Sequence, residues 1–278
     1  MNEMGDKGDI LVVIAHPDDE VFASGTICLC AEKGFRITFV CATDGEGGSR
    51  DLLPSKPDLP LREIRRQELM LSARILGASE VCFLGQPDSA LPDAEGEGSW
   101  DQLSLISTLG NVIRQHNPQL ILTHGPHGGY GHPAHRLLYR CVAAAAQAVS
   151  FAGSIFSFCG KVDGAFFSWH FDQPSDVLVD ARTFLSRRAA SLSYHQTQVA
   201  YFVQPHFPRS VRKLASAIFG LAFSFTIAGR KRVPIATPTR FFRRFPTEGL
   251  VLQKAPDAGR AQFFLEHYLN DHRVQIDR

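Results

Sequence analysis

Histidine and carboxylate side chains gather at two places in the sequence, each directly after an apolar segment. The first is the run AHPDDE at 15–20, which follows the apolar residues 10–14. The second is THGPHGGYGHPAHR at 123–136, which holds four of the eleven histidines and follows the apolar residues 120–122. Acidic side chains beside neutral imidazoles are costly unless a cation lies among them, and a divalent metal is the usual one. The two runs therefore predict one metal site that both build.

The residue types also indicate what such a metal would do. His16 and Asp19 can supply two ligands from one turn of the chain, and a histidine of the second run can supply a third. His132 and His135 share one face at the start of a helix, because their spacing is i, i+3. Three nitrogen and oxygen ligands with a fourth position free are typical of hydrolytic zinc, and iron or manganese accept the same ligands. Asp18 is the candidate general base for a metal-activated water.

Short apolar segments alternate with helical segments over the first two-thirds of the chain. We predict strands at 10–15, 36–42, 80–84 and 118–123, and helices at 19–33, 61–77, 100–116 and 133–149. This alternation predicts an α/β fold, namely a Rossmann-like, predominantly parallel sheet with helices on both faces. Loops that follow the strands of such a sheet meet at its carboxyl edge, where ligands bind. The two histidine-containing runs should converge there.

The pattern weakens after about residue 150. We predict further strands at 165–169 and 177–179 and a helix at 181–195, and we assign 1–198 to the metal-dependent core. Residues 199–278 form a C-terminal extension with a Phe-rich lid and a closing helix, which we expect to belong to the same domain.

The extension contains an apolar run at 214–228 with basic residues on both sides. The run is shorter than the ~20 residues that cross a bilayer, so no transmembrane span is expected. A buried helix is the favoured interpretation, and contact with lipid or an apolar substrate is the alternative.

The amino-acid composition indicates which binding partners and which cellular compartment to expect. The 29 basic and 28 acidic side chains nearly cancel, so no strong field indicates binding to nucleic acid. The six cysteines form no Cys-x-x-Cys pair, and we interpret them as buried free thiols. Together with an N-terminus unlike a signal peptide, they predict a cytoplasmic protein. The oligomeric state is left open, and a homo-oligomer is compatible with the sequence.

Several motifs, in the same order along the chain, resemble one known family. They are HPDDE at 16–20, TDGEG at 43–47, RRQEL at 65–69, FLGQPD at 83–88, GHPAH at 131–135 and HQTQ at 195–198. This ordered set resembles the LmbE-like, or PIG-L-like, zinc-dependent N-deacetylases, which act on N-acetylglucosaminyl groups. The resemblance covers residues 10–198.

The resemblance implies roles for the metal site. His16, Asp19 and His135 would bind Zn²⁺, with Fe²⁺ or Mn²⁺ as alternatives, and Asp18 would be the general base. The expected reaction is hydrolysis of an N-acetyl amino sugar to a free amine and acetate. An amidase that cleaves a different amide of a sugar conjugate with the same metal site is the alternative.

Two further residues are implied to stabilise the oxyanion of the reaction, namely His132 and Tyr130. Many relatives carry Asp where this chain has Ala134, and that carboxylate would orient His132 and raise its basicity. His132 should therefore be less readily protonated here, which shifts more of the stabilisation to the metal and Tyr130.

Three residues match positions that contact the sugar in the family. These are Glu46, Arg65 and Asp88. Two of them have a simpler interpretation: Arg65 could pair with an acid on a solvated helix face, and Asp88 could be a turn residue after proline. The expected partner is a small-molecule amino sugar, with an apolar aglycone or lipid as an option. A nucleotide-binding protein is disfavoured, because no Gly-x-Gly-x-x-Gly follows the first strand.

Overall fold

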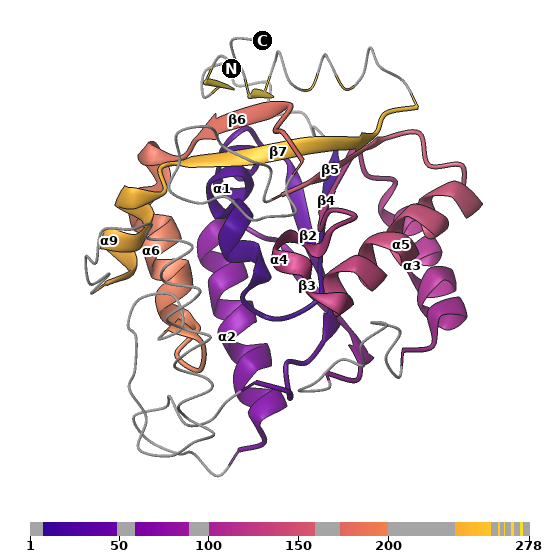
Figure 1. Cartoon of the computed structure of the whole chain (residues 1–278), viewed down its shortest axis with the longest axis horizontal. Coiled ribbons are helices and arrows are strands. Elements are labelled where there is room, and N and C mark those ends of the chain that lie inside the picture. Colours follow the sequence, from indigo (N-terminus) through magenta and orange to yellow (C-terminus); the bar gives the residue numbers. More distant parts are fainter. Residues whose placement is uncertain are drawn as a thin grey trace.

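The computed structural model describes residues 8–48, 59–88, 100–158, 173–199 and 237–256, and residues 261, 264, 268, 269, 273 and 274. Its strands are β1 (Asp9–Ile14), β2 (Arg36–Thr43), β3 (Glu80–Gln86), β4 (Leu120–Thr123), β5 (Ser154–Ser157), β6 (Val177–Asp180), β7 (Thr247–Lys254) and β8 (Arg273–Val274). Its helices are α1 (Ser24–Glu32), α2 (Leu61–Leu76), α3 (Gln102–His116), α4 (Gly128–Gly131), α5 (Pro133–Ala148), α6 (Leu185–Tyr194) and α9 (Pro238–Arg244). Two short 3₁₀ turns lie at Asp19–Ala23 and Arg182–Phe184 (Figure 1).

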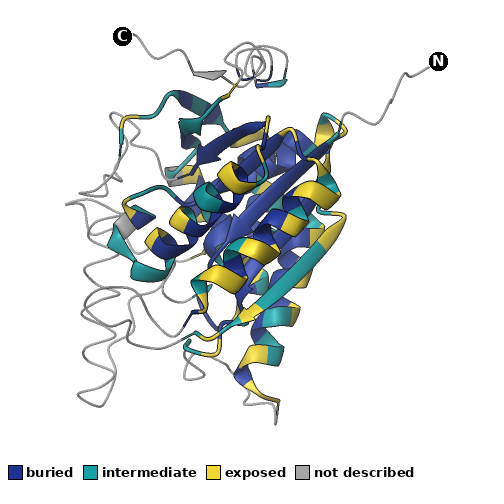
Figure 2. Ribbon diagram, turned by 90° about the vertical axis from the view of Figure 1, so that its right-hand side faces the viewer, coloured by how far each residue is buried: buried dark blue, intermediate teal, exposed yellow. Residues whose placement is uncertain are grey.

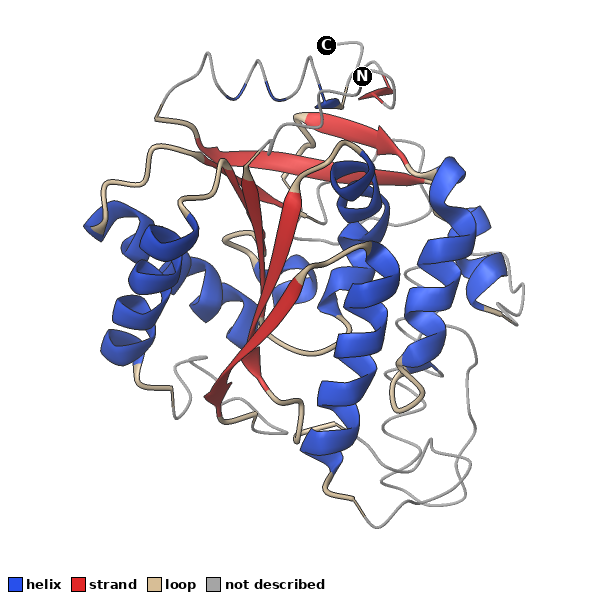
Figure 3. Ribbon diagram, turned by 180° about the vertical axis from the view of Figure 1, so that it is seen from behind, coloured by secondary structure: helices blue, strands red, loops and turns tan. Residues whose placement is uncertain are grey.

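The strands form one sheet in the order β3-β2-β1-β4-β5-β7-β6-β8. The first five of these pair in parallel. Strand β7 runs antiparallel to both of its neighbours, and β8 runs antiparallel to β6. Helices cover both faces of the parallel part (Figure 3), so the predicted fold class is confirmed.

Strand β1 lies in the middle of the five parallel strands, and every one of its side chains is buried. Successive side chains of a strand point to opposite faces. Ile10, Val12 and Ile14 accordingly pack in the cluster that contains α1 and α2, whereas Leu11 and Val13 pack in the cluster that contains α3 and α5. Figure 2 shows the strands buried between helices whose outer faces are exposed.

The predicted elements of the first 150 residues are found with small shifts at their ends. The helix predicted at 19–33 begins as a 3₁₀ turn, in which Asp19 and Glu20 are buried, and becomes α-helical only at Ser24. The strand and helix predicted at 177–179 and 181–195 correspond to β6 and α6. The strand predicted at 165–169 and the apolar run 214–228 lie outside the described residues.

Two other expectations concern the thiols and the membrane. Within the described ranges every cysteine is free; four are buried and Cys82 is half-buried. Among the helices that the structure describes, none combines the length and the apolar character that a membrane crossing requires.

Candidate metal centre

The sheet order places the loops after β1 and β4 at the position where ligands bind in open α/β sheets. From β1 the chain moves outward to β2 and β3, and it then returns to β4 on the other side of β1. The two loops therefore leave the sheet in opposite directions and open a crevice between them. The run 15–20 follows β1 and the run 124–135 follows β4, so both predicted clusters meet at this point.

Three residues of these loops form a triangle, in which Asp19 faces each of the two histidines with a different carboxylate oxygen. His135 Nε2 lies 3.3 Å from His16 Nδ1 and 3.2 Å from an Asp19 carboxylate oxygen. The other Asp19 oxygen lies 3.5 Å from His16 Nδ1. A tetrahedral zinc with bonds of about 2.0–2.1 Å separates its ligands by roughly 3.3 Å. The donor set and its spacing therefore fit a divalent metal.

A polar oxygen lies behind each of the two imidazoles, on the side away from the triangle. His135 Nδ1 lies 3.2 Å from the carbonyl oxygen of Gly128, to which it can donate, and this leaves Nε2 as the acceptor. On the far side of His16, Nε2 lies 3.6 Å from Asp88. A carboxylate or carbonyl behind a ligating histidine is the usual support of a metal site. The backbone N–H of His16 donates to Asp19 at 2.7 Å and fixes that carboxylate.

Two more histidines surround the triangle. His132, His16 and His135 can hold a metal as a group, and so can Asp19, His124 and His135. His124 stacks on His135 at 3.9 Å between ring centroids, and its Nε2 accepts the N–H of Ala15 at 3.1 Å. The same Nε2 lies 3.3 Å from an Asp19 carboxylate oxygen. The predicted triad of His16, Asp19 and His135 thus shares two residues with each of the two groups and coincides with neither.

Burial and the neighbouring charges set the protonation of these groups. Burial and the adjacent imidazoles lower the pKa of His132 to about 2, and burial lowers that of His124 to about 4. Burial alone would raise the pKa of Asp19, but His135 and His124 outweigh it and hold that pKa well below its usual value. Burial also tends to lower the pKa of His16, but Asp19 and Asp88 outweigh it and raise that pKa above its usual value. The lowered pKa values keep His132 and His124 neutral beside the Asp19 anion.

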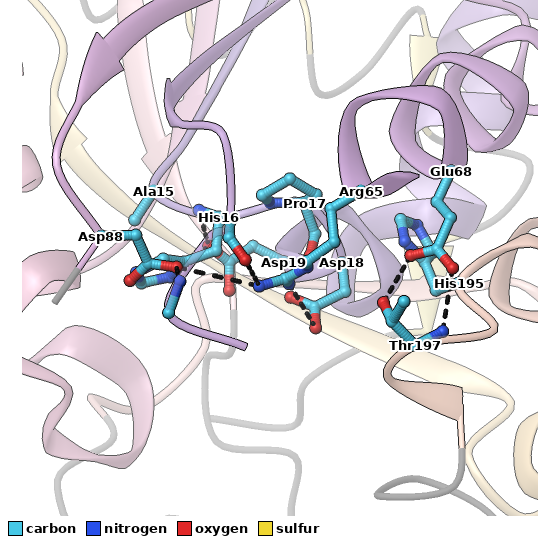
Figure 4. A network of polar contacts seen from close by, with 12 residues as sticks. Ala15, His16, Pro17, Asp18, Asp19, Arg65, Glu68, Asp88, His195 and Thr197 are labelled. Atoms are coloured by element: carbon cyan, nitrogen blue, oxygen red, sulfur yellow. Dashed lines mark hydrogen bonds and ion pairs between the residues drawn. The ribbon is translucent and has the colours of Figure 1, made fainter. Parts of the chain in front are cut away.

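Asp18 lies beside the triangle on the same loop. Its backbone has φ 114°, in the left-handed region. Its carboxylate lies 3.2 Å from the Arg65 guanidinium (Figure 4). Burial raises the pKa of Asp18 to about 7, and Arg65 opposes this rise.

The three predicted sugar-contact residues lie together. Arg65 is 3% exposed and donates to the carbonyl oxygens of Gly45 and Pro17, so the interpretation of a solvated helix face is wrong. Asp88 accepts the N–H of Gly47 at 3.1 Å, and its own N–H donates to Glu46 at 2.9 Å. The loop after β2 is thus pinned onto the loop after β3. Tyr130 lies in α4, but its side chain is outside the described part of the chain.

Comparison with known proteins places the chain in a family. Residues 11–146 match the family described as PIG-L, GlcNAc-PI de-N-acetylase. A 1D-myo-inositol 2-acetamido-2-deoxy-alpha-D-glucopyranoside deacetylase of Acidothermus cellulolyticus is 30% identical over 79% of this chain and 89% of its own length. The chain belongs to the PIG-L family. The predicted resemblance is confirmed.

Solved structures show that the PIG-L fold serves more than one reaction. The N,N'-diacetylchitobiose deacetylase of Pyrococcus horikoshii is 21% identical, with a TM-score of 0.54, over 90% of this chain and 88% of that one. The 4-carboxy-2-hydroxymuconate hydratase GalB of Pseudomonas putida is 20% identical, with a TM-score of 0.57, over 89% and 96%. These likenesses establish the fold, so the reaction has to be argued from the site.

Gln198 is a residue at this site to which the sequence interpretation assigned no role. A Cβ on Gly48 would fall 2.8 Å from Gln198 Nε2 and 2.9 Å from Arg65, so the glycine lets the loop close onto both side chains. The buried Nε2 of Gln198 has no hydrogen-bond partner within the described chain. The motif at 195–198 pointed to this segment, but only the fold brings Gln198 next to Arg65.

Proposed function

We propose that this PIG-L family protein is a metal-dependent N-deacetylase that hydrolyses an N-acetylglucosaminyl substrate to the free amine and acetate. The main support is the triangle of donor atoms from His16, Asp19 and His135 with Asp18 directly beside it. The relatives named as deacetylases of a 2-acetamido-2-deoxy-glucopyranoside support the substrate class.

In this proposal His16, Asp19 and His135 hold Zn²⁺, and Fe²⁺ or Mn²⁺ suit the same donors. Such an ion supplies Lewis-acid chemistry and lowers the pKa of water to about 7. Asp18 accepts the proton of the water that attacks the acetyl carbonyl carbon. It then returns that proton to the nitrogen as the C–N bond breaks. One carboxyl group thus serves as base when water attacks and as acid when the amine leaves.

His132 acts as a hydrogen-bond donor to the oxyanion in this proposal. It is held among His16 and His135 with ring centroids 4.9 and 4.5 Å away, and no carboxylate at Ala134 favours its protonated form. A neutral imidazole N–H stabilises a developing oxyanion by hydrogen bonding. Tyr130 on the adjacent α4 is proposed as the second donor.

The substrate contacts are proposed from the pinned loops. Glu46 and Asp88 lie on the loops after β2 and β3, and Arg65 binds the first of these loops from α2. In this proposal they hydrogen-bond to the hydroxyls of the sugar ring. We propose a small amino-sugar substrate in the cytoplasm.

Acetate release measures the proposed reaction directly. The purified protein loaded with zinc is incubated with a panel of N-acetylglucosaminides whose aglycones run from inositol to an alkyl chain. We expect acetate and free amine in equal amounts from at least one of them, and none after chelation of the metal. Release of a different acid from an N-acyl series would favour the alternative amidase. Release of no acid from any amide would contradict hydrolysis as the reaction.

A further inference from the structure

Glu20 is a fully buried carboxylate to which the proposed function gives no role. One of its oxygens accepts the hydroxyl of Ser72 at 2.5 Å and lies 2.5 Å from His195 Nε2. The other oxygen accepts the backbone N–H of Asp18 at 3.0 Å. Both oxygens are therefore bound, as a buried carboxylate requires. Glu20 thereby connects the loop after β1 to α2 and to the segment after α6.

The backbone that Glu20 holds has an unusual conformation. Asp18, Asn117 and Ser150 are the positive-φ residues other than glycine in the described chain. Asn117 caps the C-terminus of α3 and Ser150 follows that of α5, where left-handed residues are common. Asp18 instead precedes a 3₁₀ turn in the crevice. Such a conformation persists only where the surroundings hold it, and here an acceptor binds the N–H.

Helix α2 holds Asp18 through two separate routes. Arg65 binds the Asp18 carboxylate from one face of the helix. Ser72, two turns further along that face, binds Glu20, which binds the Asp18 main chain. Glu68 lies between them on the same face, but it accepts the N–H and hydroxyl of Thr197 and does not contact Asp18 (Figure 4).

We propose that Glu20 is a positioning residue for Asp18: by accepting the Asp18 N–H, it holds the positive-φ backbone that directs the Asp18 carboxylate into the crevice. Glu20 acts as a hydrogen-bond acceptor, so a neutral side chain of the same shape with an oxygen can replace it. This role rests on the proposed function, in which Asp18 is the base.

The variant Glu20→Met fills the same space without an acceptor. We expect its kcat to fall about tenfold to a hundredfold, because small displacements of a catalytic group cost this much. KM and the bound metal should not change, since neither depends on Asp18. Glu20→Gln keeps one oxygen for the Asp18 N–H and should recover most of the lost kcat. Hydrogen exchange of the Asp18 amide, measured on the metal-free chain, should be faster in Glu20→Met than in the wild type.

Glu68→Met is the matched control, because Glu68 is also a buried carboxylate that accepts a backbone N–H and a hydroxyl. It should lower the melting temperature while kcat and Asp18 exchange stay near wild type. Unchanged kcat in Glu20→Met, or equal losses in both Met variants, would overturn the proposal. So would a Glu20→Gln variant as slow as Glu20→Met, because charge would then be the operative property.

The kinetic and exchange measurements still test the proposal if Glu20→Met does not fold or if the wild-type protein releases no acetate. If Glu20→Met does not fold, Glu20→Asp replaces it, because a carboxylate one methylene shorter cannot bridge Asp18 and His195. The expected loss of kcat and of exchange protection is then the same, and wild-type values would overturn the proposal. If the wild-type protein releases no acetate, the proposed function fails, but exchange of the Asp18 amide still decides the positioning role.

Discussion

Individual residues of the crevice have separable tasks. Donor atoms of His16, Asp19 and His135 lie within 3.5 Å of one another from residue to residue, whereas the Asp18 carboxylate pairs with Arg65 at 3.2 Å. A change at Asp18 should therefore affect the reaction and spare the metal.

The first prediction concerns Asp18→Asn. An amide of the same shape cannot accept the proton, so kcat should fall by about 100-fold to 10,000-fold. Bound metal, measured by atomic emission, should equal that of the wild type. Asp101→Asn is the control, since Asp101 caps α3 through the N–H of Ser104. Wild-type turnover in Asp18→Asn would exclude Asp18 as the base.

The second prediction concerns the pH dependence of stability at His195. Burial tends to lower the pKa of His195, but Glu20 outweighs burial and raises it above 6.5. A raised pKa in the folded state stabilises the protein below the unfolded pKa, and this contribution is lost as pH rises through the folded pKa. In the metal-free protein, His195→Gln should therefore lower the urea midpoint most at pH 6 and progressively less at alkaline pH. A difference that grows with pH would contradict this assignment.

At the scale of elements, the short helix α4 and the start of α5 orient His135, one of the proposed metal ligands. Gly128 has φ 70°, and its carbonyl oxygen supports His135. A Cβ there would fall 2.9 Å from the Arg136 side chain and 3.3 Å from the Arg136 backbone. The glycine is therefore required both by its backbone conformation and by the close approach of α5.

The third prediction follows for Gly128→Ala. Displacing the carbonyl behind a ligating histidine lowers metal affinity by about tenfold to a hundredfold. Gly85→Ala is the matched control, because Gly85 has φ 66° but open space around the Cβ position. Both variants should lose some stability, and only Gly128→Ala should lose zinc affinity in a competition titration with a chelator. Equal affinity in the two variants would mean that the Gly128 carbonyl does not support the ligand.

The elements differ in how far the sequence predicts them. Strands β1 and β4 are predictable because each is a continuous apolar run that ends in polar residues. Strand β5 has serine at both ends, and β7 contains Gly249 and polar residues at its ends. Neither segment therefore shows the apolar run or the regular alternation that predicts a strand. The convergence of the two histidine-containing runs follows from sheet topology and is predictable. The hydrogen bonds from Arg65 to carbonyl oxygens cannot be predicted in this way, because they depend on loops that only the fold brings together.

At the scale of the molecule, a late strand is part of the same sheet as the early ones. Strand β7 lies between β5 and β6. Its Glu248 accepts the N–H groups of Gly25 and Thr26 at 2.8 Å each and pairs with Arg188 at 3.0 Å. A strand beyond residue 198 thus binds the first turn of α1, and we propose that residues 199–278 complete the core domain.

The fourth prediction tests this long-range contact with Glu248→Gln. The change leaves Arg188 buried without its charge partner, which costs about 3–5 kcal/mol of unfolding free energy. The melting temperature should fall, and metal content below it should not change. Arg182→Gln removes the exposed pair with Asp180 and should leave the melting temperature near that of the wild type. If the two variants had the same melting temperature, Glu248 would not stabilise the contact of β7 with α1 and α6.

The position of a bound metal tests the central claim most directly. Crystals of the zinc-loaded protein should give one strong anomalous peak at the zinc absorption edge, bonded to His16 Nδ1, Asp19 and His135 Nε2. Bond lengths of about 2.0–2.2 Å are expected, with one position left for water. A peak elsewhere, or zinc held by His124 in place of His16, would contradict the site proposed for this protein.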